Sequence, residues 1–222
     1  MSKALRVVVP PHPLIGHWLT LLRDHQTPSA LFATAMGELG RWLTYEALRD
    51  WIPYQRVSVE TPMARTEGTV VDASVPLLAV PMLSGGLGLW EGARTVLPHA
   101  ALAPVALQPD GHGGIHCGFS ALPEAIPERA GVLVFAPQVA SAARLIHLLE
   151  MLEAKGVQGL RVRVITTVAA SPGLKQLGER FGDLTLYTGC IDAELDGEGR
   201  ILPGVGDAEG RLCGLNGSAF VG

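Results

Sequence analysis

Charged residues are few in this sequence and form no cluster of one sign. Of its 222 residues only 17% are charged, the formal net charge is −4, and lysine and arginine form no run. We therefore do not expect nucleic acid or a membrane surface as a partner. No apolar run is long enough to cross a bilayer, and the first apolar stretch is too short for a signal peptide. These absences predict a cytoplasmic protein.

Cysteine is also scarce. The three cysteines, Cys117, Cys190 and Cys213, are an odd number without close spacing. Such cysteines are typical of reduced thiols in a reducing compartment. The segment from His112 to Cys117 has a His-x3-His-Cys spacing that could bind a metal, but no fourth ligand is apparent. A flexible glycine-containing loop with two chance histidines is the simpler interpretation, and we expect no metal site.

Glycine and proline, in contrast, are frequent, with 27 and 16 residues. They indicate many turns between short elements and do not suit a helical bundle. Because 48% of the residues are hydrophobic, a chain of this length can bury a sizeable core. We expect residues 1–222 to form one domain.

The first quarter of the chain is predicted to be helical and to lead into a β-hairpin. Apolar residues recur at helical spacing over residues 13–24 and again over residues 28–50. Residues 56–61 and 66–71 are β-type segments, and together they predict a hairpin or arm.

Beyond the arm, apolar β-rich runs alternate with helical patterns. Such alternation predicts an α/β fold, in which helices cover both faces of a parallel sheet. The last thirty-odd residues, from Asp192, are rich in glycine and acids and are expected to be loop-like. The expected strands are residues 6–9, 77–81, 101–107, 132–135, 161–168 and 184–187, and the expected helices after the arm are residues 87–97, 140–155 and 172–181.

Three segments are expected to meet at the carboxyl ends of the strands, where doubly wound sheets bind ligands. In MLSGGLGLWEG, residues 82–92, the glycines could let backbone N–H groups approach an anion, but a tight packing turn explains them equally well. VLVFAPQVASAARL, residues 132–145, has the position of a phosphate loop without its glycines, and its composition favours an ordinary strand-to-helix turn. ILPGVGDAEGR, residues 201–211, has enough constrained backbone to hold the edge of a planar ligand through its main chain.

Several segments resemble the uracil phosphoribosyltransferases, most closely the cyanobacterial and chloroplast members. The match covers nearly the whole chain, and its most specific segments are HPLIGHWLTLLRD, MGELGRWLTYEA and PGVGDA. The resemblance implies transfer of ribose 5-phosphate from phosphoribosyl pyrophosphate (PRPP) to N1 of uracil, which gives UMP and pyrophosphate. It also implies a type I phosphoribosyltransferase-like fold, a parallel-sheet core with a helical hood and a β-arm, and a homodimer. The corresponding regions are the N-terminal helices (1–54), the arm (55–75), the α/β core (76–190) and the C-terminal hood with the uracil-type loop (191–222).

The resemblance implies that the base-binding half of the site is intact. In the family, the PGVGDA-like loop holds uracil largely through main-chain contacts. By position, those contacts fall on Ile201, Gly206, Asp207 and Ala208.

The PRPP half departs from the family pattern. The resemblance implies an acid that binds the ribose hydroxyls and a Thr-Gly-Gly-Ser-like run that wraps the 5′-phosphate. In the pyrophosphate loop, Ser84, Gly85 and Gly86, a serine replaces the family's arginine, and a second family arginine aligns near Gln108. Only Ser141 keeps the family chemistry in the PRPP loop, whose positions are Ala136, Ser141, Ala142, Ala143 and Arg144.

These replacements predict weak or lost transferase activity. A hydrogen bond to a charged group contributes roughly 1.5–3 kcal/mol, so four losses remove on the order of 6 kcal/mol, or about ten-thousandfold in binding. An active enzyme would use Mg²⁺ with PRPP, and an inactive one no cofactor. The expected partners are small molecules: uracil, UMP, and PRPP if the chain is active. A non-catalytic sensor of uracil or UMP and a partner-binding scaffold are the alternatives.

Overall fold

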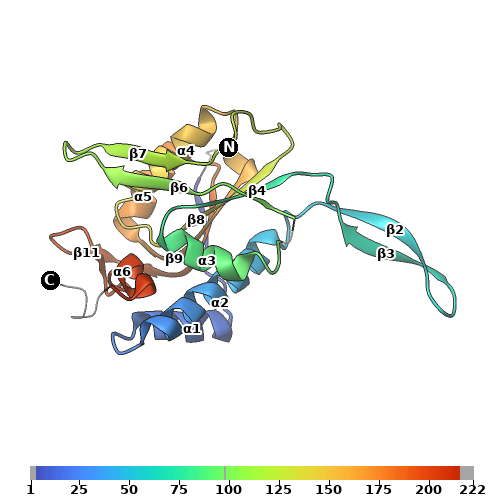
Figure 1. Ribbon diagram of the computed structural model, residues 1–222, viewed down its shortest axis with the longest axis horizontal. Helices are drawn as coiled ribbons and strands as arrows, with labels where there is room; N and C mark the ends of the chain where they lie inside the picture. Colours follow the sequence, from blue (N-terminus) through green and yellow to red (C-terminus); the bar gives the residue numbers. More distant parts are fainter. Residues whose placement is uncertain (1–3, 98, 216–222) are drawn as a thin grey trace.

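A computed structural model describes residues 4–97 and 99–215 of the chain (Figure 1). Its centre is a six-stranded sheet in which every neighbouring pair is parallel, in the order β1-β10-β9-β8-β4-β5. The sheet confirms the predicted α/β class. Its strands are β1 (Arg6–Val8), β4 (Leu77–Pro81), β5 (Ala101–Leu102), β8 (Gly131–Ala136), β9 (Val162–Ala170) and β10 (Thr185–Asp192).

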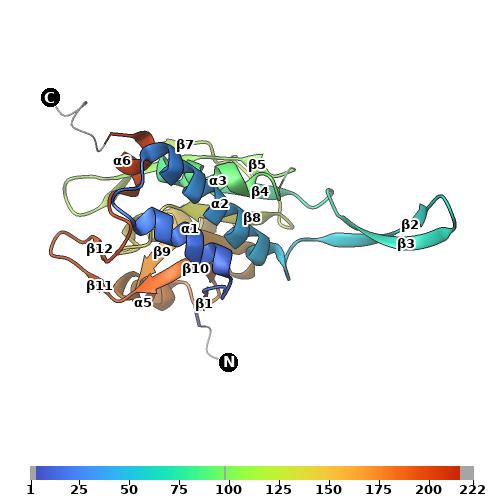
Figure 2. The same ribbon diagram turned by 90° about the horizontal axis from the view of Figure 1, so that it is seen from below.

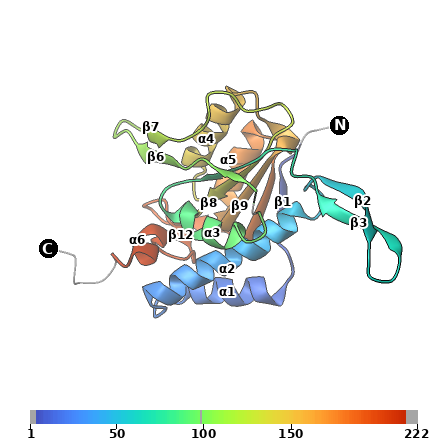
Figure 3. The same ribbon diagram turned by 45° about the vertical axis from the view of Figure 1, so that its right-hand side comes forward.

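Helices cover both faces of the sheet, as Figure 3 shows. Every residue of β8 is buried, and its alternate side chains enter two different cores. Leu133 and Phe135 face the first core, whereas Val132 and Val134 face the second. The first layer is α1 (Pro13–Arg23), α2 (Ser29–Leu48) and α3 (Gly85–Ala93), and the second is α4 (Ala143–Glu153) and α5 (Ser171–Arg180), with a 3-10 turn, η1 (Gly159–Arg161), before β9.

The arm is a two-stranded antiparallel hairpin that projects from the body (Figure 2). It consists of β2 (Tyr54–Glu60) and β3 (Arg65–Val71), which confirms the predicted hairpin. Apolar side chains along it are exposed: Tyr54 by 67% and Met63 by 92%. None of the helices in residues 4–97 and 99–215 is both long and apolar enough to span a bilayer.

The strand expected over residues 101–107 was wrong as a single element. β5 ends at Leu102, and the chain then forms a hairpin of β6 (Val105–Pro109) and β7 (Ile115–Ser120) outside the main sheet. Pro104 lies between β5 and β6, and proline cannot donate a ladder hydrogen bond. The flexible loop expected from His112 to Cys117 was also wrong, because its second half is β7.

Two helix starts also differ from the prediction. The helix expected from residue 87 begins at Gly85 and ends at Ala93, and the helix expected from residue 140 begins only at Ala143. Before α4 the backbone is instead bonded to β9: Val139 N donates to Val168 O at 3.0 Å, and Ala170 N donates to Val139 O at 2.8 Å. These bonds keep residues 137–142 out of the helix.

The region after Asp192 is more regular than the sequence indicated. It contains β11 (Glu194–Leu195), β12 (Ile201–Leu202) and α6 (Ala208–Cys213). Helix α6 packs against α2 and α3, so this late helix lies beside the first helical layer. This arrangement matches the expected helical hood. Residues 216–222, assigned to the same hood, lie outside the described residues.

Candidate functional site

A cleft of about 580 Å³ lies at the carboxyl ends of the central strands. Its walls are the connection from β8 to α4, the β6–β7 hairpin and the segment from residue 198 to residue 209. The structure therefore brings together seven of the predicted site residues, from positions about sixty apart in the sequence. They are Ser141, Ala142, Ala143, Arg144, Ile201, Gly206 and Asp207.

The connection from β8 to α4 is held in a fixed shape. Thr167 Oγ1 donates to Pro137 O at 2.6 Å, in addition to the two bonds that Val139 makes with β9. Ala142 has φ 62°, and among residues 4–97 and 99–215 it is the only residue other than glycine at positive φ. This backbone suits glycine, which has no Cβ to clash. The loop therefore keeps a glycine-type conformation although its residue is alanine.

The side chains of this loop offer little to a phosphate. Residues 140, 142 and 143 contribute only methyl groups to the cleft, and Ser141 contributes one hydroxyl. Ala136, the position that matches the family's ribose-binding acid, is only 1% exposed and does not line the cleft. The helix that follows begins here without a side-chain cap.

The predicted pyrophosphate loop lies behind the cleft wall. Met82 and Leu83 line the cleft, whereas Ser84, Gly85 and Gly86 do not. The Leu83–Ser84 peptide bond is cis. A Cβ on Gly85 would lie 2.7 Å from Pro137 Cβ, and one on Gly86 would collide with Phe135 O. Of the two interpretations of these glycines, the structure supports close packing.

The opposite wall is the predicted uracil loop. Gly204 and Gly206 have φ of 59° and 70°, and the Leu202–Pro203 bond is cis. Asp207 caps α6, because its Oδ1 accepts from Gly210 N at 3.0 Å. Ala208 is 2% exposed and lies behind the wall. Main-chain groups of this loop therefore face the cleft in a constrained conformation, and the assignment of Ile201, Gly206, Asp207 and Ala208 to uracil stays a prediction.

An ion pair anchors the predicted uracil loop to the end of α1. Arg23 donates from Nη2 to Asp192 Oδ1 at 2.7 Å and from Nη1 to Asp192 Oδ2 at 3.0 Å. The same Oδ2 accepts from Gly204 N at 2.9 Å, and Arg23 also donates to Gly204 O at 3.1 Å. Burial alone would raise the pKa of Asp192, but the bonds from Arg23 and Gly204 outweigh it and hold that pKa below its ordinary value.

A second arginine fixes the far side of the same loop. Arg211 donates to Leu22 O, to Val205 O at 2.9 Å and to Asp24 O at 2.6 Å, and it stacks on the Phe32 ring at 4.3 Å. Burial lowers the pKa of Arg211. A cleft of about 560 Å³, lined by both anchoring arginines, opens on this side. The loop from Pro203 to Asp207 thus lies between two clefts and is bonded at several points.

Two contacts join the walls of the first cleft. Gln138 Nε2 donates to Gly206 O at 2.9 Å, and Arg144 Nη1 lies 3.7 Å from Glu209 Oε1. At the rim, Arg200 forms an ion pair with Glu198. Neither Gln138 nor Glu209 was predicted to have a role, although Gln138 lies within residues 132–145 and Glu209 within residues 201–211. Their polar side chains inside these two motifs were the signal that could have indicated a contact between the two walls.

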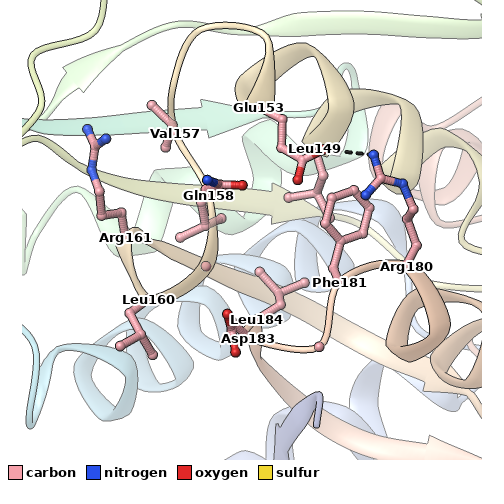
Figure 4. Close-up of a pocket in the computed structure, with 13 residues that line it drawn as sticks. Leu149, Glu153, Val157, Gln158, Leu160, Arg161, Arg180, Phe181, Asp183 and Leu184 are labelled. Atoms are coloured by element: carbon pink, nitrogen blue, oxygen red, sulfur yellow. Dashed lines mark hydrogen bonds and ion pairs between the residues drawn. The ribbon is translucent and has the colours of Figure 1, made fainter. Parts of the chain in front are cut away.

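A further cleft, of about 430 Å³, lies at the other end of the sheet, where β9 and β10 begin (Figure 4). Its two arginines lie on opposite sides, and both are engaged by the protein. Arg161 donates to three carbonyls, of Ala130, Gly156 and Pro127, and Arg180 bonds Glu153 at 2.8 Å. None of the predicted site residues lines it.

No group of three or more histidine, cysteine, aspartate or glutamate residues that could hold a metal occurs in residues 4–97 and 99–215. The histidine spacing from His112 to Cys117 lies on a hairpin instead. Asp110 Oδ1 accepts from His112 N and Gly114 N at 2.8 Å each and so forms the hairpin turn. These two bonds lower the pKa of Asp110.

Comparison with known proteins shows the family of this chain. The family model described as uracil phosphoribosyltransferase matches residues 9–214. A uracil phosphoribosyltransferase from Synechococcus elongatus is 46% identical over 96% of this chain and 99% of its own length. A chloroplastic one from Arabidopsis thaliana is 36% identical over 96% of this chain and 72% of its own length.

The fold agrees as well. A solved structure of an Aquifex aeolicus protein is similar to this chain with a TM-score of 0.82 and 29% identity. The similarity covers 93% of this chain and 97% of that one. Together with the family match over nearly the whole sequence, these findings identify the family: the chain belongs to the uracil phosphoribosyltransferases.

Proposed function

We propose that the chain binds uracil in the cleft at the carboxyl ends of the strands and transfers ribose 5-phosphate from PRPP weakly or not at all. The observation that carries this proposal is the contrast between the two walls of one cleft. The wall of residues 201–209 presents constrained main-chain groups, whereas residues 140–143 present methyl groups and one hydroxyl. The first wall suits a flat polar base, and the second offers few side-chain donors to a phosphate.

The uracil wall is suited to binding because it is already ordered. Uracil has N–H donors and carbonyl acceptors along its edge, which main-chain carbonyl and N–H groups can pair. Arg23, Asp192 and Arg211 hold the loop before any ligand arrives. A preorganised loop loses little conformational entropy on binding, so main-chain contacts suffice for affinity.

Any Mg²⁺ would enter with the pyrophosphate of PRPP. The acids of the cleft do not suit a resident metal, because Glu198 lies against Arg200 and Glu209 lies near Arg144. We therefore derive no step through a protein-bound metal.

The test is an assay of UMP formation from uracil and PRPP with Mg²⁺, using the purified chain. We expect a rate far below the ordinary enzyme range of roughly 1–10³ s⁻¹. Calorimetry should at the same time detect uracil binding. Turnover within the ordinary range would contradict the loss of PRPP binding, and no uracil binding would contradict the base site.

Restoring the family residues provides the matched gain-of-function test. We expect Ser84→Arg, Ala142→Gly and Ala143→Gly together to raise PRPP affinity, and further Ala136→Asp to raise it more. The triple variant leaves the buried position 136 unchanged, so it separates ligand binding from folding. An unchanged PRPP affinity in a folded triple variant would count against the residue assignments.

We also propose that two copies of the chain associate. A two-stranded hairpin is marginally stable by itself in water, and this arm exposes Tyr54, Val70 and Met63. A second copy would cover these side chains. Light scattering of the purified chain should give twice the monomer mass, and a monomer at every concentration would contradict the proposal.

A further inference from the structure

Gln138 places a polar side chain where the two walls of the first cleft meet. It belongs to the connection from β8 to α4, lines the cleft and is partly exposed. Its Nε2 donates to Gly206 O, on the predicted uracil loop, at 2.9 Å. Gly206 is exposed and lines the same cleft. A base held by the main chain of Gly206 would therefore lie beside the Gln138 amide.

This amide still has groups to offer a ligand. A glutamine amide has two N–H donors and one carbonyl acceptor, and the bond to Gly206 O uses a single N–H. None of the described residues hydrogen-bonds to Gln138 Oε1, and Oε1 is not among the buried atoms that lack a partner, so it is accessible. The backbone N–H of Gly206 likewise has no acceptor among the residues that the structure describes. An acceptor and two donors therefore lie at this point of the cleft, open to a ligand.

The bond to Gly206 O also fixes the orientation of the amide. A carbonyl oxygen only accepts hydrogen bonds, so the nitrogen end of the amide must face it. Exchanging the two ends would bring Gln138 Oε1 against Gly206 O, two acceptors with no proton between them. The bonds that Pro137 and Val139 make with β9 hold the backbone on both sides of Gln138. Gln138 therefore presents its acceptor and its remaining donor in one order only.

We infer that Gln138 is a specificity-determining residue that selects uracil over cytosine, with Oε1 accepting from N3–H of the base and Nε2 donating to O4. The inference rests on the proposed function, in which N1 faces the ribose and the N3–O4 edge is left for the protein. Along that edge uracil presents a donor and then an acceptor, which complement the amide. Cytosine presents the opposite order, so that two acceptors and two donors would face each other.

The test compares the wild type with Gln138→Met, since methionine has about the same length but no amide. Calorimetry measures uracil affinity, and displacement of uracil measures cytosine affinity. We expect uracil affinity to fall about three- to tenfold while cytosine affinity stays the same or rises. Cytosine losing as much affinity as uracil would overturn the inference, because Gln138 would then only order the loop. Unchanged uracil affinity would overturn it too, as would cytosine that displaces uracil from neither protein.

Gln158→Met is the matched control. Gln158 is exposed and lines the cleft at the other end of the sheet, so the same change there should leave both affinities within about twofold of the wild type. A loss of uracil selectivity in this control as large as in Gln138→Met would contradict a specific role of Gln138. Failure of the wild type to bind uracil would overturn the proposed function itself. Uracil binding with the same selectivity in Gln138→Met would overturn only the role of Gln138.

Discussion

The Asp192→Asn substitution tests the anchor of the predicted uracil loop. Asp192 is 5% exposed and receives two hydrogen bonds from Arg23 and one from Gly204 N. Asparagine has nearly the same shape but no charge, and it can accept through only one of its two terminal atoms. The substitution therefore leaves the half-buried guanidinium of Arg23 without its carboxylate.

The expected loss of stability is about 2–4 kcal/mol. Removing one partner of a buried ion pair costs roughly 3–5 kcal/mol, because the other charge stays buried without compensation. The loss expected here lies below that range because the Arg23 side chain is 24% exposed and water can reach part of it. The oxygen retained by asparagine can still accept from Gly204 N or Arg23, which reduces the loss further.

The stability difference should depend on pH. The pKa of Asp192 is lowered from its ordinary value of 3.8 in the folded chain. A group with a lowered folded pKa stabilises the protein fully above its unfolded pKa, and this contribution is lost as the pH falls through the folded pKa. The wild type should therefore exceed Asp192→Asn in stability above about pH 4, and the two should converge in stronger acid.

Urea denaturation at several pH values measures this difference, and calorimetry measures uracil affinity at neutral pH. Arg23→Met and the double variant complete a double-mutant cycle, in which we expect the two losses not to add. A loss below about 1 kcal/mol at neutral pH, or additive losses, would refute the anchoring role. A loss that is the same at pH 3 and pH 7 would refute the pKa argument.

Three further substitutions test the walls of the cleft. Gln138→Ala should weaken uracil binding about three- to tenfold, because it removes the bond to Gly206 O; an unchanged affinity in calorimetry argues against the contact. Ala142→Gly should stabilise the chain by up to about 1 kcal/mol in urea denaturation, because glycine adopts the left-handed conformation without strain and this gain exceeds its entropy cost. A clear loss of stability would contradict the φ of 62°. Arg211→Met should lower the free energy of unfolding by about 2–4 kcal/mol, because it removes three hydrogen bonds to carbonyls and the cation–π contact with Phe32. An unchanged free energy of unfolding in the same assay would exclude a role of Arg211 in holding the loop.

The elements were largely predictable because their signals are local. The period of apolar residues located α1, α2, the arm and the central strands to within a few residues. The prediction failed where another part of the fold overrides the local pattern. The chain before α4 bonds to β9 instead of forming helix, and residues 106–109 pair with a hairpin strand instead of the sheet edge. Neither partner can be inferred from the apolar period, which reports only which face of an element is buried.

The sequence by itself determined the family and the α/β class, because these depend on residue types at fixed spacing and on the period of apolar residues. The assignment of residues 136–144 to an altered PRPP loop comes from the same spacing and stays a prediction. Only the tertiary structure decided how the two loops face each other across one cleft. Arg23 and Asp192 are 169 positions apart, and Gln138 and Gly206 are 68 apart. Such contacts depend on where whole strands and helices end in space. Ala142 is the clearest example. The composition of its loop suggested an ordinary turn, whereas hydrogen bonds with β9 hold the loop in a conformation typical of glycine.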